Sequence, residues 1–204
     1  MDSLPIRKVI NQIANGAIRI PSFQRGFVWE PEDVAFFMDS LYKQYPVGAV
    51  LLWRTREKLH TERQLGRFIL PDPIKDYPID YVLDGQQRLT SIFSVFQTEL
   101  QPEEDAGWMD IYYIIGSNRM SQQSAFIALS DADVDLNKHF PMRVLFNTIA
   151  YRKATENLPD NVVIEIDELL SVFQETVIPV QLMETDDKGN VAIVFESFLY
   201  NINR

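Results

Sequence analysis

The sequence has no cysteine and only two histidines among its 204 residues. Without cysteine, disulfide bonds, thiolate nucleophiles and zinc sites with cysteine ligands are excluded, which fits a reducing cytosol. The sequence also lacks an apolar run of about 18 residues, which a membrane-spanning helix needs. Its N-terminus lacks the basic-then-apolar pattern of a secretory signal. We therefore expect a cytoplasmic protein with no membrane partner.

Basic residues are scarce in the second half of the chain. The formal net charge is −10. Residues 1–100 hold 12 basic and 12 acidic residues, whereas residues 101–204 hold 7 basic and 17 acidic ones. DNA binding by charge alone is disfavoured, because neutralising phosphates takes a dense basic face. The basic stretch RTREKLHTERQLGR (54–67) is interpreted as a solvated hairpin or loop rather than a nucleic-acid patch.

Hydrophobic residues make up 46% of the chain and aromatic residues 12%, which is enough for a sizeable core in one large domain. Apolar runs predict strands at 47–53, 79–83, 109–115, 125–129 and 176–184. Helical periodicity predicts helices at 4–15, 31–45, 141–155, 166–174 and 191–200. This alternation of strands and helices predicts an α/β or α+β layered domain.

The stretch YVLDGQQRLTSIFSVF (81–96) joins a buried strand to a helix. Its apolar residues change there from a continuous run to the spacing of one helical face. Asp84 is a natural N-cap for the helix, and Gln87 stands where a capping box needs a reciprocal partner. Gly85 permits the tight turn between the two elements.

Arg88 is not explained by that capping. A cation in the first turn faces the positive end of the helix dipole, where an anion is favoured. One interpretation is a phosphate bound above the helix start, held by backbone N–H groups, two amide side chains and the guanidinium. The other is a plain capped helix. The segment matches neither a Walker A loop nor a Gly-x-Gly-x-x-Gly dinucleotide loop, so a nucleotide site would be of another type.

The stretch IPSFQRGFVW (20–29) interrupts the periodicity and predicts an extended loop. It places Gln24 and Arg25 between three aromatic residues. One interpretation has the guanidinium on a phosphate while an aromatic ring packs on a base or closes the pocket. The alternative is a loop docked on the core, with Arg25 paired to a carboxylate.

Together, IPSFQRGFVWEPEDVAFFMDSLYKQYPVGAVLLW and YVLDGQQRLTSI resemble the two hallmark blocks of GmrSD-type restriction-enzyme N-terminal domains. The resemblance implies a ParB/sulfiredoxin-like nucleotide-binding fold with a mixed sheet and flanking helices. It also implies NTP binding and hydrolysis in bacterial anti-phage systems, commonly beside an HNH-type nuclease that cuts modified DNA. Two alternatives stay open: a ParB-like DNA-binding or modification-sensing module without hydrolysis, and a non-catalytic protein-interaction scaffold.

The resemblance also implies site residues. The core motif falls on Asp84, Gly85, Gln86, Gln87 and Arg88, followed by Thr90. The first block falls on Pro21, Phe23, Gln24, Arg25 and Trp29, with Asp39 and Ser40 on the helix behind it. We expect a pocket between the Gln24–Arg25 loop and the helix start at Asp84 to Arg88, in which Arg25 and Arg88 contact phosphates and Gly85 and the helix start supply backbone donors.

The catalytic roles are narrower expectations from the same resemblance. Gln86 or Gln87 would orient an attacking water, and Asp84 would bind Mg²⁺ or accept a proton. The cofactors expected are an NTP and Mg²⁺, with the metal ligands unassigned.

The end of the chain departs from the family pattern. VAIVFESFLYNINR resembles a Phe-Glu-Arg-Ile-Asn block, but either Ser197 stands where arginine would come, or Ile202 and Asn203 match the block after a short insertion. The chain then stops where the family continues with glycine. We expect residues 1–204 to form one domain that is truncated at its C-terminal end, with no nuclease domain of its own.

Overall fold

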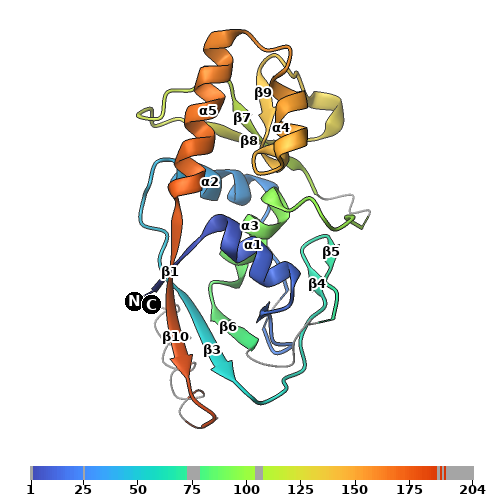
Figure 1. Cartoon of the computed structure of the whole chain (residues 1–204), viewed down its shortest axis with the longest axis vertical. Helices are drawn as coiled ribbons and strands as arrows, with labels where there is room; N and C mark the ends of the chain where they lie inside the picture. The colour runs from blue at the N-terminus through green and yellow to red at the C-terminus, as the bar shows by residue number, and fades with distance from the viewer. Residues whose placement is uncertain are drawn as a thin grey trace.

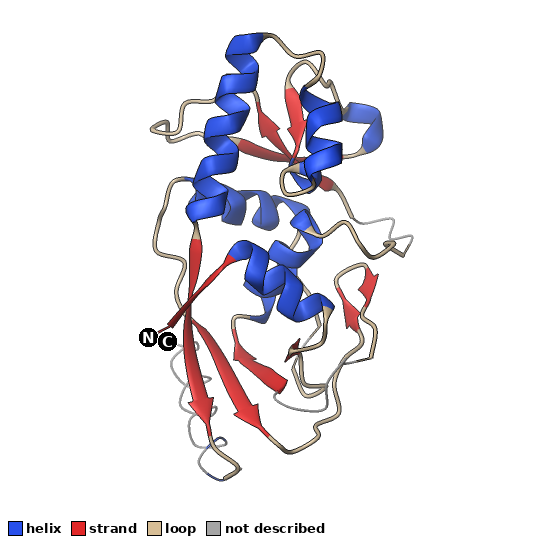
Figure 2. Cartoon of the chain, viewed as in Figure 1, coloured by secondary structure: helices blue, strands red, loops and turns tan. Residues whose placement is uncertain are grey.

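The computed structural model describes residues 2–24, 26–72, 79–103, 108–187, 189 and 191. A larger sheet lies at one end of the long axis and a smaller sheet at the other (Figure 1). Helices α1, α2 and α3 lie between the two sheets, and α4 and α5 flank the smaller one (Figures 1 and 2). The mixed α/β class predicted from the sequence is confirmed.

Within the described residues, the larger sheet has the strand order β1-β10-β3-β6-β2. Its strands are β1 (Asp2–Pro5), β2 (Ile18–Arg19), β3 (Val50–Thr55), β6 (Ile79–Asp84) and β10 (Val177–Glu184). Strand β10 pairs parallel with β3, and β2 pairs parallel with β6. The β1–β10 and β3–β6 pairs are antiparallel. The sheet is therefore mixed, and its central strands β3 and β6 are almost wholly buried, as their apolar runs predict.

Three helices lie between the two sheets, and α2 and α3 carry parts of the two sequence blocks (Figure 1). They are α1 (Ile6–Ala14), α2 (Pro31–Tyr42) and α3 (Gln86–Phe96). Helix α2 begins at Pro31, as predicted, with a capping box between Glu30 and Asp33. Helices α1 and α3 pack together, and Val9, Ile92 and Phe93 are fully buried in the core. No described helix has the length and apolar character to cross a membrane.

The smaller sheet is antiparallel, in the order β8-β7-β9 within the described residues. The elements of this region are β7 (Asp110–Ile114), β8 (Phe126–Leu129), β9 (His139–Pro141), α4 (Thr148–Thr155) and α5 (Asp160–Glu175). Tyr42 on α2 packs edge-on against Tyr113 and Phe126 and stacks on Phe173, which joins this sheet to α2 and α5. Burial, with a hydrogen bond to Glu165, raises the pKa of Tyr113. The hydroxyl therefore stays a donor that ties β7 to α5.

Several element boundaries predicted from the sequence are wrong. The helix predicted at 141–155 is split into a 3₁₀ turn, Met142–Val144, and α4, because Asn147 caps the new start by accepting from Ala150 N at 3.0 Å. Strands β1 and β9 were not predicted, since such short strands depend on their pairing partners. Helix α5 begins after Pro159, earlier than predicted. The helix predicted at 191–200 lies outside the described residues beyond 191.

Candidate functional site

The start of α3 is built around Gly85. Its φ is 93°, and a Cβ there would lie 2.9 Å from Val50 Cγ2 and 3.3 Å from the Val50 backbone. Gly85 takes the N-cap position, where it has no side chain with which to cap the helix. The predicted N-cap at Asp84 and capping box with Gln87 are therefore wrong: Asp84 is the last residue of β6, one position too early. The first N–H groups of α3 are left for another acceptor.

Gln87 and Gln24 join the two sequence blocks. The Gln87 amide oxygen accepts from Val28 N at 2.9 Å and from Trp29 N at 3.3 Å, and its nitrogen donates to Gly26 O at 3.1 Å. Gln24 Nε2 donates to Leu83 O at 2.9 Å. The loop of the first block is thus tied to the end of β6 and the start of α3, although the blocks are about 60 residues apart in sequence.

Arg88 has partners within the chain. Its Nη1 donates to Val47 O at 2.8 Å and to Ala49 O at 3.0 Å, and its Nη2 binds Asp84 Oδ2 at 2.8 Å. The guanidinium therefore holds the segment that leads into β3 and neutralises the carboxylate that ends β6. This arrangement explains a cation in the first turn of α3 without a bound anion. A phosphate contact by Arg88 stays a prediction.

A cavity of about 500 Å³ lies between the first-block loop, the segment 62–66 and α3. This volume falls within the range of small-molecule sites. The cavity is lined by Gln24, Gly26, Phe27, Glu62, Gln64, Leu65, Gly66, Gln86, Thr90 and Trp108. Both sequence blocks contribute to it, as the predicted pocket between them requires. Arg88 is not among its lining residues.

Gln86 and Thr90 face this cavity from successive turns of α3. Gln86 is 9% exposed and Thr90 0% exposed. Within the described residues the Thr90 hydroxyl is buried without a hydrogen-bond partner. Residues four apart share a helical face, whereas Arg88, two residues from each, points to the opposite side. On the cavity side of α3, the Thr90 hydroxyl therefore lacks a hydrogen-bond partner among the described residues. On the opposite side, towards β3, the Arg88 guanidinium is hydrogen-bonded.

The hairpin of β4 (Gln64–Leu65) and β5 (Phe68–Ile69) closes the cavity through Gly66. A Cβ on Gly66 would lie 2.6 Å from Ser94 Oγ and 3.4 Å from Thr90 Cγ2. Glycine therefore lets the hairpin turn pack directly on α3. Ser94 Oγ is also buried without a partner among the described residues, but Ser94 does not line the cavity.

An aromatic wall completes the cavity. Phe27 and Trp108 have ring centroids 6.5 Å apart. Arg67 covers Trp108 with its guanidinium carbon 5.1 Å from the ring centroid, and it does not line the cavity. Asp110 Oδ1 accepts from Trp108 Nε1 at 3.1 Å and from Arg67 Nη2 at 2.8 Å. The Trp108 ring is therefore held in one orientation.

Other residues predicted for the site lie away from the cavity. Pro21 is buried and bridges to Thr61, Phe23 is 57% exposed, and Trp29 packs on Phe37 at 5.4 Å. Asp39 pairs with Lys43 and accepts from Ala125 N, whereas Ser40 donates to Phe36 O within α2. Arg25 lies outside the described residues.

Five cavity residues that lie outside the two sequence blocks were missed from the sequence: Glu62, Gln64, Leu65, Gly66 and Trp108. Glu62 is placed by a backbone hydrogen bond from its N–H to Ile20 O at 2.9 Å. The stretch 54–67, interpreted from the sequence as a solvated hairpin or loop, contains a hairpin around Gly66, but Leu65 and Phe68 of its strands are buried. Trp108 carries no local signal, because its position depends on Asp110 and Arg67.

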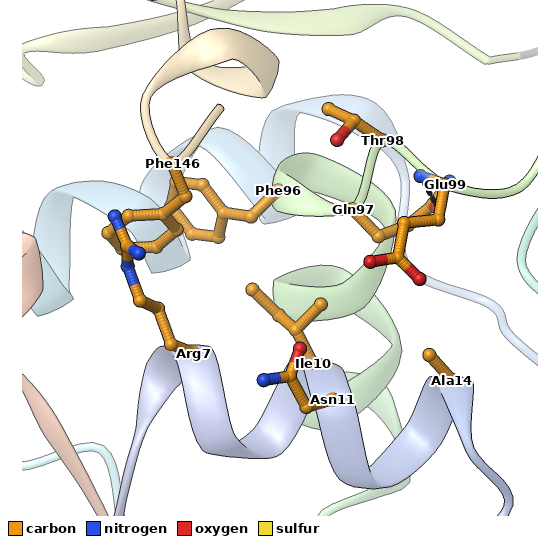
Figure 3. A pocket seen from close by; sticks show the side chains of 9 residues that line it. All are labelled: Arg7, Ile10, Asn11, Ala14, Phe96, Gln97, Thr98, Glu99 and Phe146. Atoms are coloured by element: carbon orange, nitrogen blue, oxygen red, sulfur yellow. Dashed lines mark hydrogen bonds between the residues drawn. The ribbon is translucent and has the colours of Figure 1, made fainter. Parts of the chain in front are cut away.

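Two other cavities lie beside α1. The first, of about 140 Å³, lies between α1 and the end of α3, where Arg7 covers the Phe146 ring (Figure 3); it is below the size of most small-molecule sites. The second, of about 500 Å³, lies between α1 and the larger sheet, where Arg54 and Asp80 form a bidentate ion pair. None of the predicted site residues lines either cavity. The described residues contain no cluster of three His, Cys, Asp or Glu side chains that could hold a metal ion.

Comparison with known proteins agrees with the sequence blocks. The family model described as "GmrSD restriction endonuclease, N-terminal domain" matches residues 6–200. An uncharacterized protein of Methanocaldococcus jannaschii is 23% identical over an alignment of 227 positions that covers 96% of this chain. The chain spans 38% of the length of that relative.

Proposed function

The chain belongs to the family of GmrSD restriction endonuclease N-terminal domains, and we propose that it binds and hydrolyses a nucleoside triphosphate. The observation that carries the proposal is the cavity between the two blocks. There the Thr90 hydroxyl is buried without a partner among the described residues, and Gln86, the first residue of α3, brings the helix start to the cavity. A buried polar group without a partner is destabilising, which favours a ligand that completes its hydrogen bonds.

The phosphates would bind at the start of α3, where free N–H groups and the helix dipole favour an anion. Gln86 is the better candidate to orient an attacking water, because the Gln87 amide is already committed to the first-block loop. Arg88 would act by holding the Val47–Ala49 backbone beside the site. The remaining roles predicted for Arg25 and Gly85 belong to the same proposal.

Mg²⁺ would arrive with the phosphates rather than occupy a site made by the protein alone. Mg²⁺ commonly binds through one or two carboxylates together with substrate phosphates and waters. Asp84 fits that role in part, since only its Oδ2 is bound by Arg88 and its side chain is 31% exposed. The metal would supply neutralisation of phosphate charge.

The wider setting is proposed from the family. Nuclease activity would come from an HNH-type domain or subunit elsewhere, and recognition of modified DNA would reside in the full-length protein or a partner. The nucleotide domain would then regulate cleavage.

The test is a titration of the four NTPs and of duplex DNA against the chain, followed by a phosphate-release assay with Mg²⁺. We expect saturable NTP binding, and phosphate release that Gln86→Ala lowers by about 10²-fold. Gln181→Ala, which removes an exposed amide on β10 outside the cavity, is the matched control and should retain release. DNA binding without NTP binding would overturn the proposal in favour of a DNA-binding module. Failure of both ligands to bind would leave an interaction scaffold.

A further inference from the structure

We infer that the inner part of the cavity, between Thr90 and Trp108, is a nucleobase site. This inference rests on the proposed function and adds which end of the nucleotide the cavity takes. It also assigns ligand-binding roles to Trp108 and Gln64, which neither the sequence motifs nor the family match singled out, and selects Phe27 among the three aromatic residues of the first block.

The described lining of the cavity favours a base over the polyphosphate. Glu62 is the one charged side chain among the described residues that line it. A triphosphate carries several negative charges, and a carboxylate would repel them instead of compensating them. Amide, hydroxyl and aromatic groups suit a neutral ring with hydrogen-bonding edges. The base therefore fits the interior, and the phosphates fit the uncapped helix start.

The spacing along α3 gives the nucleotide a direction. Gln86 lies at the first helical position, and Thr90 lies one turn further along the same face. One turn is a rise of about 5.4 Å, so Thr90 is separated from the phosphate end by the scale of a ribose. The Thr90 hydroxyl has an unused donor and acceptor among the described residues and almost no accessible surface, so its side chain would turn towards the cavity to bond the edge of a base there.

Trp108 supplies a stacking surface that is already in place. Arg67 covers it from outside the cavity, and Asp110 fixes its Nε1–H. Arg143 also binds Asp110, at 3.2 Å, which adds a second cation to this anchor. Aromatic rings held this way bind bases with little loss of side-chain freedom. Phe27 extends the surface from the first-block loop, tilted by 42° to Trp108.

The experiment compares three ligands that share parts of a nucleotide: the NTP that binds best, its nucleoside, and inorganic tripolyphosphate. Trp108→Ala should weaken the NTP and the nucleoside alike, by about tenfold to a hundredfold, and leave tripolyphosphate unchanged. Trp108→Phe should restore most of the affinity. Trp29→Phe is the control, because Trp29 packs on Phe37 outside the cavity.

Quenching of tryptophan fluorescence by the nucleoside gives a second readout, and it should vanish in Trp108→Phe. The base site is overturned if the NTP binds but Trp108→Ala keeps full affinity, or if only tripolyphosphate competes with the NTP. Absence of any NTP binding defeats the proposed function together with this inference. If a single-stranded oligonucleotide displaces the nucleoside while free nucleotides fail, the site takes a base of DNA and the inference is wrong.

Discussion

The two faces of α3 differ in how their polar groups are satisfied. On the face towards β3, Arg88 makes three hydrogen bonds and every one reaches a group of the same chain. On the face towards the cavity, the Thr90 hydroxyl is fully buried without a partner among the described residues. Both faces belong to the same sequence block. We interpret Arg88 as a residue that holds the site together and Thr90 as a residue that binds a ligand.

That difference changes which residue of the motif best indicates a binding site. The arginine is its most conspicuous residue, yet its hydrogen bonds account for its position. The threonine is chemically modest, yet a buried hydroxyl without a partner costs about 1–3 kcal/mol. A destabilising group of this kind beside a cavity of ligand size has a functional explanation if a ligand supplies the missing hydrogen bond. The unpaired face is therefore the stronger indication of a binding site.

Arg88→Ala should have the largest effect on folding. The change removes a charge-assisted bond to Asp84 and leaves the carbonyls of Val47 and Ala49 without their donor, so we expect a loss of about 3 kcal/mol. For a domain of this size that loss lowers Tm by about 6–12 °C, measurable by calorimetry.

Arg88→Lys distinguishes a structural clamp, in which Arg88 bonds Val47 O, Ala49 O and the Asp84 carboxylate, from a phosphate contact. Lysine keeps the charge but cannot reproduce the fork that reaches two carbonyls and a carboxylate. A loss of stability close to that of Arg88→Ala supports the clamp. Wild-type stability with weakened NTP binding would contradict the structural clamp and indicate that Arg88 contacts the ligand.

Gln87→Leu should have the next largest effect. Its amide makes three hydrogen bonds to the loop backbone of residues 26–29, and their loss should lower stability by about 1–2 kcal/mol. Gln86→Leu, the adjacent amide, should change stability by less than about 0.5 kcal/mol. Chemical denaturation of the two variants measures their free energies of unfolding. Equal losses of stability would contradict the assignment of a structural role to Gln87 but not to Gln86.

Thr90→Val should raise the stability of the ligand-free chain by about 1 kcal/mol, because valine keeps the shape and removes the unpaired hydroxyl. Thermal melting without nucleotide measures the gain, which corresponds to a rise in Tm of about 2–4 °C. A fall in Tm would mean that a buried water or another group already satisfies the hydroxyl.

The sequence predicted the strand, the turn and the helix around Asp84 and Gly85, because these depend on residues that are neighbours in the chain. It also predicted that the two blocks meet. It did not predict that Arg88 binds Val47 and Ala49, which lie 41 and 39 residues away. Trp108 was missed for the same reason: its orientation is set by Asp110 and Arg67, and spacing carries no information about such contacts.

The central claim is that the cavity face of α3 binds nucleotide, and the affinity of Thr90→Val beside that of Ser94→Ala tests it most directly. Both changes remove a buried, unpartnered hydroxyl from neighbouring turns, but only Thr90 lines the cavity. By isothermal titration with NTP, we predict about tenfold weaker binding for Thr90→Val and wild-type binding for Ser94→Ala. Equal affinities in the two variants would contradict the assignment.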